Sequence, residues 1–188
     1  MSTLQDSIDA ALKTMESLRQ LEEPLGRAAD AVLAALLAGG KLLVCGNGGS
    51  AADGADFSTE FACRFVGDRR PFPAINLAQG GSLVTATAND YGYDEVFARQ
   101  VRAFGKPGDV LVAISTSGNS RSIVRAIEEA RSGGLQTIAL LGKDGGACRG
   151  LAGIELTVRS ATTARIQEAH KFLLHTLCEM VEPALAAQ

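Results

Sequence analysis

The chain has 188 residues, 46% of them hydrophobic, which is enough for one domain with a substantial buried core. Its formal net charge of −3 gives no general electrostatic reason to expect nucleic-acid binding. No apolar run approaches the roughly 18 residues of a membrane span, and the amino terminus lacks the basic start and apolar centre of a signal peptide. We therefore expect neither a nucleic-acid nor a membrane partner.

The four cysteines are widely spaced and form no CxxC pair. Cys45 and Cys178 lie in apolar runs, which favours buried free thiols in a reducing compartment. We therefore expect a cytoplasmic protein.

The first part of the chain has the pattern of helices. Apolar residues recur at three- and four-residue steps between residues 3 and 38. We expect Glu22-Glu23-Pro24 to separate two helices and Gly39-Gly40 to end the second. These helices have more apolar positions than one face of a sheet needs. The pattern predicts a helical hairpin over 1–38 for oligomerisation, although a cap packed on its own chain would leave a similar pattern.

From residue 39 to residue 188, short apolar runs alternate with helical stretches. We predict strands over 41–45, 73–77, 109–114, 135–141 and 153–158. We predict helices over 50–65, 81–88, 93–104, 119–132, 145–151 and 164–182. Nearly continuous apolar strands are typical of a parallel sheet that is covered on both faces. With no linker dividing the chain, we expect a single α/β domain over 1–188.

Two turns rich in small residues follow apolar runs and precede helical stretches: Cys45-Gly46-Asn47-Gly48-Gly49-Ser50 and Ser115-Thr116-Ser117-Gly118-Asn119-Ser120. A turn of this kind brings backbone N–H groups close to a ligand, and the helix dipole favours negative charge there. The second turn adds four hydroxyls that suit the oxygens of a phosphate. Together the turns predict a phosphorylated small molecule as ligand.

Each turn also has a simpler interpretation. The first could be only a tight connection, since it is neither a dinucleotide-binding GxGxxG nor a Walker loop. The second could only cap the next helix through Asn119 or Ser120, but capping needs one hydroxyl and the turn has four.

Four motifs in register resemble the sugar isomerase (SIS) domain family over nearly the whole chain. They are the two turns, Asn89-Asp90-Tyr91-Gly92 and Arg165-Ile166-Gln167-Glu168. The resemblance is greatest to the bacterial sedoheptulose 7-phosphate isomerases. It implies a five-stranded parallel sheet between helices, in a flavodoxin- or Rossmann-like three-layer arrangement. It also implies a homotetramer with active sites at subunit interfaces.

The resemblance implies a reaction and a set of substrate-binding residues. The reaction is conversion of sedoheptulose 7-phosphate to D-glycero-D-manno-heptose 7-phosphate by enediolate proton transfer, the first step towards nucleotide-activated heptose for lipopolysaccharide or capsule. Ser115, Thr116, Ser117 and Ser120 would hold the phosphate. The rest of the substrate would meet Asn47, Gly48, Gly49, Ser50, Asn89, Asp90 and Gln167.

Such an isomerisation needs a base that moves a proton between C1 and C2 and a group that handles the oxygen-bound proton. By resemblance, Glu60 and His175 are these catalytic residues. From the residues alone, Glu60 could be a solvated helix carboxylate and His175 a core histidine. We expect the other histidine, His170, at the surface or an interface.

The resemblance also implies one zinc ion per subunit, held by Asp56, Glu60, Gln167 and His175. Asp56 departs from the family, which usually has a histidine there, and an oxygen-rich set also admits manganese or no metal. In addition, Gln167 and His175 lie roughly 12 Å apart along a straight helix and about 80° around it. They could share one ion only with a distorted helix start or with help from another subunit.

Two alternatives remain open from the sequence. The same fold resembles a non-catalytic bacterial protein that associates with the replication initiator, but that branch lacks the glutamate found here at Glu60. The protein could also isomerise or sense a different sugar phosphate, a possibility that the change at Asp56 raises.

Overall fold

The computed structural model describes residues 3–188, so Met1 and Ser2 of the predicted domain lie outside the described residues. Within this range the chain forms a five-stranded sheet in the order β2-β1-β3-β4-β5, with every neighbouring pair parallel. The strands are β1 (Leu42–Gly46), β2 (Ala74–Asn76), β3 (Val110–Ser115), β4 (Gln136–Gly142) and β5 (Ile154–Val158). All the predicted strands are confirmed, with small shifts at their ends.

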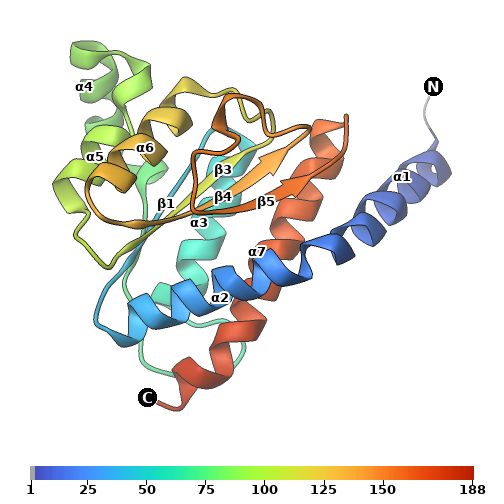
Figure 1. Cartoon of the computed structure of the whole chain (residues 1–188), viewed down its shortest axis with the longest axis horizontal. Helices are drawn as coiled ribbons and strands as arrows, with labels where there is room; N and C mark the ends of the chain where they lie inside the picture. Colours follow the sequence, from blue (N-terminus) through green and yellow to red (C-terminus); the bar gives the residue numbers. More distant parts are fainter. Residues whose placement is uncertain (1–2) are drawn as a thin grey trace.

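Helices cover both faces of the sheet (Figure 1). They are α1 (Leu4–Glu16), α2 (Glu22–Leu37), α3 (Gly49–Ala62), α4 (Ser82–Tyr91), α5 (Ala98–Phe104), α6 (Arg121–Ser132) and α7 (Thr163–Ala186). Alternate residues of β1 point to opposite faces: Leu42 and Val44 pack with α2, α3 and α7, while Leu43 and Cys45 pack with α5 and α6. This confirms the predicted three-layer α/β fold.

The amino-terminal helices do not form the predicted hairpin. A short 3-10 helix, η1 (Ser17–Leu21), joins α1 to α2, and the two helices continue in roughly one direction (Figure 1). Glu22-Glu23-Pro24 begins α2 instead of separating helices, because proline in a first helical turn loses no hydrogen bond. A guanidinium nitrogen of Arg165 on α7 donates to the carbonyl of Ser7 at 2.6 Å and holds α1 to the domain.

Two further helix predictions are wrong in part. The predicted helix over 93–104 divides into a short 3-10 helix, η3 (Tyr93–Glu95), and α5. The predicted helix over 145–151 is only the 3-10 turn η4 (Gly146–Cys148), where Gly145 and Gly146 both have positive φ and interrupt a regular helix.

The strand order determines where a ligand can bind. From β1 the chain first adds β2 on one side and then β3 on the other, so the carboxyl ends of β1 and β3 meet at the topological switch point. Gly46 at the end of β1 pairs with Ile114 near the end of β3. Open parallel sheets bind ligands at this position. Among residues 3–188, no helix has the length and apolar character needed to cross a membrane.

Candidate functional site

The first predicted turn leaves backbone donors available at the start of α3. Gly48 has φ +57° and ψ −124°, a conformation that a side chain would oppose, and α3 starts at Gly49 without a side-chain cap. Within residues 3–188, no hydrogen bond is formed by the N–H groups of Gly48 and Gly49. Ser50 is buried in the first turn of the helix. The arrangement is that of an anion-binding helix start.

The second turn lies beside the first. Two of its hydroxyl oxygens accept hydrogen bonds from the backbone, which leaves the hydroxyl protons free to be donated to a ligand. The Ser115 hydroxyl oxygen accepts from the N–H of Gly118 at 3.1 Å, and that of Ser117 accepts from the N–H of Asn119 at 3.1 Å. Ser120 occupies the N-cap position of α6 but makes no capping hydrogen bond. A capping role therefore does not explain why residue 120 carries a hydroxyl.

The loop after β4 supports the second turn. A Cβ on Gly118, whose φ is +66°, would overlap the carbonyl of Gly145. Asn119 accepts from the N–H of Ala147 at 2.9 Å through its side-chain oxygen. This close backbone approach requires glycine at position 118 and holds Thr116 and Ser117, which are half-buried, at the sheet edge.

Asn47 is held from two sides by residues that the sequence did not single out. Its amide nitrogen donates to the Ser122 hydroxyl at 3.0 Å, and its amide oxygen accepts from the Tyr93 hydroxyl at 2.8 Å. Tyr93 directly follows the Asn89-Asp90-Tyr91-Gly92 motif, so its proximity to the motif was the available signal. The two bonds fix the orientation of the Asn47 amide.

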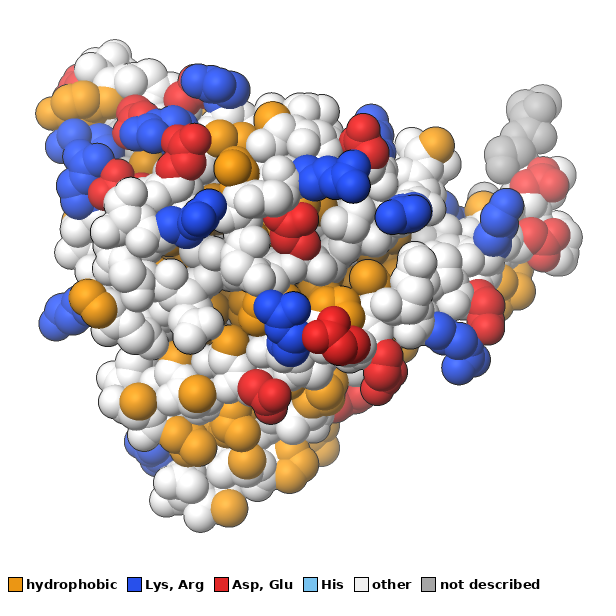
Figure 2. All heavy atoms as spheres, in the orientation of Figure 1, with side chains coloured by type: hydrophobic (Ala, Val, Ile, Leu, Met, Phe, Trp, Pro, Cys, Tyr) orange, Lys and Arg blue, Asp and Glu red, His pale blue; other side chains and the backbone are white. Residues whose placement is uncertain are grey.

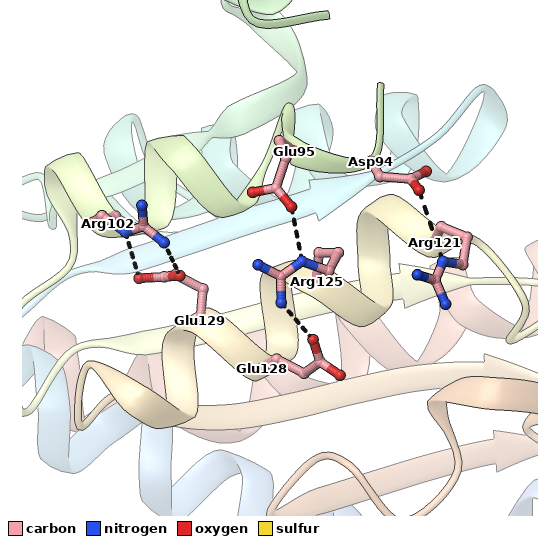
Figure 3. A network of polar contacts seen from close by, with 7 residues as sticks. All are labelled: Asp94, Glu95, Arg102, Arg121, Arg125, Glu128 and Glu129. Atoms are coloured by element: carbon pink, nitrogen blue, oxygen red, sulfur yellow. Dashed lines mark hydrogen bonds and ion pairs between the residues drawn. The ribbon is translucent and has the colours of Figure 1, made fainter. Parts of the chain in front are cut away.

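Ion pairs fasten the segment that carries Tyr93 (Figure 3). Glu95 of η3 pairs with Arg125 of α6 at 2.8 Å, and Asp94 pairs with Arg121 at 3.7 Å. A third link joins Arg102 on α5 to Glu129 at 2.6 Å. These contacts join η3 and α5 to α6 and so hold Tyr93 near the first turn.

Asn89 and Asp90 are exposed at the end of α4. The Asn89 amide donates to the Asp90 carboxylate at 2.8 Å. Within residues 3–188, no hydrogen bond joins either side chain to the two turns. The structure brings the neighbouring Tyr93, rather than these two side chains, into contact with Asn47.

Helices α3 and α7 pack side by side and run in the same direction. At one end a Cβ on Gly49 would overlap the Gln167 amide, so glycine leaves the room that Gln167 occupies. One turn further, Asp53 faces Lys171 at 3.5 Å. Near the other end, the Glu60 carboxylate contributes to raising the pKa of the Cys178 thiol to about 12, after burial as the main cause. The predicted acid–base residues thus lie on two adjoining helices.

Glu60 and His175 are each half-buried on this α3–α7 face. The Phe65 ring, just beyond α3, lies 6.0 Å from the His175 ring. A guanidinium nitrogen of Arg69 donates to the backbone carbonyl of Glu60 at 2.6 Å, and Arg69 pairs with the half-buried Glu182 at 3.0 Å. These contacts fix the end of α3 that carries Glu60.

Asp53 and Asp56 share Lys171 as their ion-pair partner. The Lys171 ammonium contacts the Asp56 carboxylate closely and the Asp53 carboxylate more loosely. Burial raises the pKa of the Asp53 carboxyl, while the Lys171 charge acts in the opposite direction. The sequence analysis did not identify Lys171, because only the packing of α3 on α7 brings it to the carboxylates.

His170, which we expected at the surface or an interface, instead lies inside the chain. It is fully buried, with its Nε2 3.1 Å from the carbonyl of Leu141 and its Nδ1 without a partner within residues 3–188. Burial lowers the pKa of His170 to about 4, so the ring is neutral at pH 7. The ring faces inward because α7 packs against the sheet through the Ala169–His170 side.

The residues predicted to hold zinc do not form a closed ligand set. Among residues 3–188, no group of three or more histidine, cysteine, aspartate or glutamate side chains is placed to hold a metal ion. The Asp56 carboxylate is bound to an ammonium, and Gln167 lies at the Gly49 end of the face, two helical turns before His175. Within the described part of this single chain, the side chains therefore do not assemble the zinc site that the resemblance implies.

The most voluminous hollow described lies away from these residues. It measures about 800 Å³ at the carboxyl ends of β4 and β5 and is lined by Lys143, Asp144, Arg149, Thr157, Arg159, Ser160 and Ala161. None of these is a predicted site residue.

The fold and the two turns at the switch point define a domain of the sugar-isomerase class. The family model described as the SIS domain matches residues 6–142. The chain belongs to the SIS domain family, among its phosphoheptose isomerases.

The similarity to known phosphoheptose isomerases extends over the full length. The chain is 44% identical over 192 residues to a phosphoheptose isomerase of Shewanella sp. (strain ANA-3), covering 100% of this chain and 98% of the relative. The structure of phosphoheptose isomerase GmhA from Neisseria gonorrhoeae matches with a TM-score of 0.87 and 39% identity, over 96% of this chain and 100% of that one. A phosphoheptose isomerase from Francisella tularensis matches with a TM-score of 0.87 and 36% identity, over 97% and 100% of the two chains.

Proposed function

We propose that the protein is an isomerase that converts sedoheptulose 7-phosphate to D-glycero-D-manno-heptose 7-phosphate. The observation that carries the proposal is the combination in one unit of two anion-binding turns with an adjoining face that bears Glu60 and His175. The full-length similarity to phosphoheptose isomerases supports it. The product would supply the synthesis of nucleotide-activated heptose.

The two turns bind the phosphate end of the substrate. The hydroxyls of Ser115, Thr116, Ser117 and Ser120 donate to its oxygens, and the dipoles of α3 and α6 favour the negative charge. Asn47, held by Tyr93 and Ser122, presents a fixed amide to the sugar. The substrate then extends from the turns over Gly48 and Gly49 towards the α3–α7 face.

Glu60 and His175 move the protons. In this proposal the Glu60 carboxylate takes the proton from C1 of the ketose and returns it to C2. His175 moves the proton between the two oxygens. The enediolate that forms between these steps carries negative charge, which hydrogen-bond donors beside C1 and C2 would stabilise. Because Glu60 is half-buried, its proton exchanges with water between the two transfers.

The predicted zinc ion is not part of this mechanism. Asp56 is paired with Lys171, and the side chains on α3 and α7 do not form the required set. We therefore assign no step to a metal ion. The metal content of the purified protein tests whether zinc is bound.

We also propose a cytoplasmic homotetramer with active sites at subunit interfaces. Leu4, Ile8 and Leu12 form an exposed apolar stripe on α1, with exposed fractions of 77%, 43% and 63%. More hydrophobic side chains gather over the lower part of the face seen in Figure 2, and Leu37 at the end of α2 is also exposed. Such surfaces favour contact with further copies. Residues 1–38 would supply much of that contact, with 39–188 as the sugar-phosphate-binding core.

The test is an NMR assay of the purified protein with sedoheptulose 7-phosphate and, separately, fructose 6-phosphate. We expect the aldoheptose phosphate to form and the hexose phosphate to be turned over at least about 100-fold more slowly. Faster turnover of fructose 6-phosphate would move the assignment to another sugar phosphate. No turnover of either by folded protein would favour a non-catalytic interaction protein.

A further inference from the structure

The acidic side of α3 meets a single cation of α7. The Lys171 ammonium contacts the Asp56 carboxylate and lies 3.5 Å from Asp53. Within residues 3–188, neither carboxylate has another cationic partner. The Lys171 side chain is 29% exposed and that of Asp53 only 15%, so the pair lies partly inside the groove between the two helices.

Lys171 occupies the middle of the residue set in which a metal was expected. It lies four residues after Gln167 and four before His175, one helical turn from each. Its ammonium binds the carboxylate of Asp56, another of the four expected ligands. A divalent cation bound to Asp56 would lie next to the Lys171 ammonium, and the repulsion between the two positive charges opposes its binding.

We propose that Lys171 is a built-in cation that takes the place of the metal ion on the α3–α7 face. An aspartate at position 56 suits an ammonium, whereas the histidine usual in the family suits zinc. The ammonium has three N–H donors, of which one is donated to Asp56, while Asp53 lies at ion-pair distance. A remaining donor is available to an oxygen of the enediolate, a consequence that rests on the isomerase activity proposed above.

An ordinary salt bridge is the competing explanation. The Asp56 side chain is 62% exposed, and exposed ion pairs contribute little to stability. A purely structural pair would leave the affinity for zinc unchanged when Lys171 is replaced. A cation that stands in for the metal would instead block zinc, and its removal would open the site.

The decisive experiment measures zinc affinity by competition with a chromophoric chelator, using metal-free full-length protein. We expect K171M to bind zinc at least about 100-fold more tightly than the unaltered protein, and K171R to remain as weak. K13M, which removes an exposed lysine of α1, is the matched control and should change nothing. Zinc present at one ion per chain in the unaltered protein, or equal affinity in K171M, would overturn the proposal.

A second arm measures turnover with a chelator present. The unaltered isomerase should keep its full rate in EDTA, whereas loss of activity that zinc restores would contradict the proposal. Absence of turnover under every condition would refute the proposed function but not the proposal for Lys171, which the zinc affinities test independently.

Discussion

The phosphate-binding turns and the α3–α7 face differ in how they are built. Each turn is built from consecutive residues at the end of one strand, and the second turn is closed by a local bond from the Gly118 N–H to Ser115. The α3–α7 face joins residues as distant in the sequence as Asp56 and Lys171, which lie 115 positions apart. The comparison teaches that one chain can keep the local turns of its family and still change the chemistry of the long-range face.

The largest expected effect on activity comes from replacing Glu60 on the α3–α7 face. E60Q preserves the size of the side chain but removes its basicity, and a positioned general base contributes about 10²–10⁴ in rate. We expect kcat to fall about 1,000-fold in the NMR assay with little change in KM.

E179Q is the matched control, because Glu179 is exposed on α7. Equal activity of E60Q and the unaltered protein would remove Glu60 from the catalytic role and leave the turns as the only part of the site supported by mutation.

The buried His170 on α7 makes the free energy of unfolding depend on pH. His170 has a pKa of about 4 in the folded state and 6.5 as its ordinary value, so between these values the unfolded chain binds a proton that the folded chain does not. The contribution of His170 to stability should therefore be constant above about pH 6.5 and fall by about 3 kcal/mol down to pH 4.

Urea unfolding across this range measures the slope. H170F and H170N, which remove the titration, should each have a smaller loss than the unaltered protein. Identical slopes in all three proteins would show that His170 titrates normally.

A smaller effect is expected in the second turn. Because the Ser120 hydroxyl makes no capping bond, S120A should leave Tm unchanged, while loss of a hydrogen bond to phosphate raises KM about 10-fold. S132A, at the other end of α6, is the control. A fall in Tm without a change in KM would favour the capping interpretation.

The smallest effect concerns Tyr93. Y93F removes the hydroxyl that donates to Asn47 and should lower kcat/KM several-fold, up to about 10-fold. Y91F is the control, since the Tyr91 ring packs under the Arg99 guanidinium and its hydroxyl is not needed for that contact. Equal losses in the two variants would mean that Tyr93 does not orient the amide.

Most of the fold could be predicted because its signals are local. The strands are short apolar runs, and each turn follows its strand directly. The hairpin prediction failed because Pro24 is acceptable in a first helical turn and therefore did not mark a break.

Much of the site depends on packing that no short motif reports. Tyr93 contacts Asn47 across 46 positions, and Lys171 reaches α3 only because α3 and α7 cover the same face of the sheet. The His170 side chain likewise faces inward because α7 packs against β4. These residues need the strand order before they can be assigned.

Isomerisation in D2O tests the central claim most directly. The protein is incubated with sedoheptulose 7-phosphate in D2O, and the aldoheptose phosphate is examined by NMR. Proton transfer through a half-buried Glu60 that exchanges with solvent predicts deuterium at C2 of the product. A product without deuterium at C2, or no product from folded protein, would contradict it.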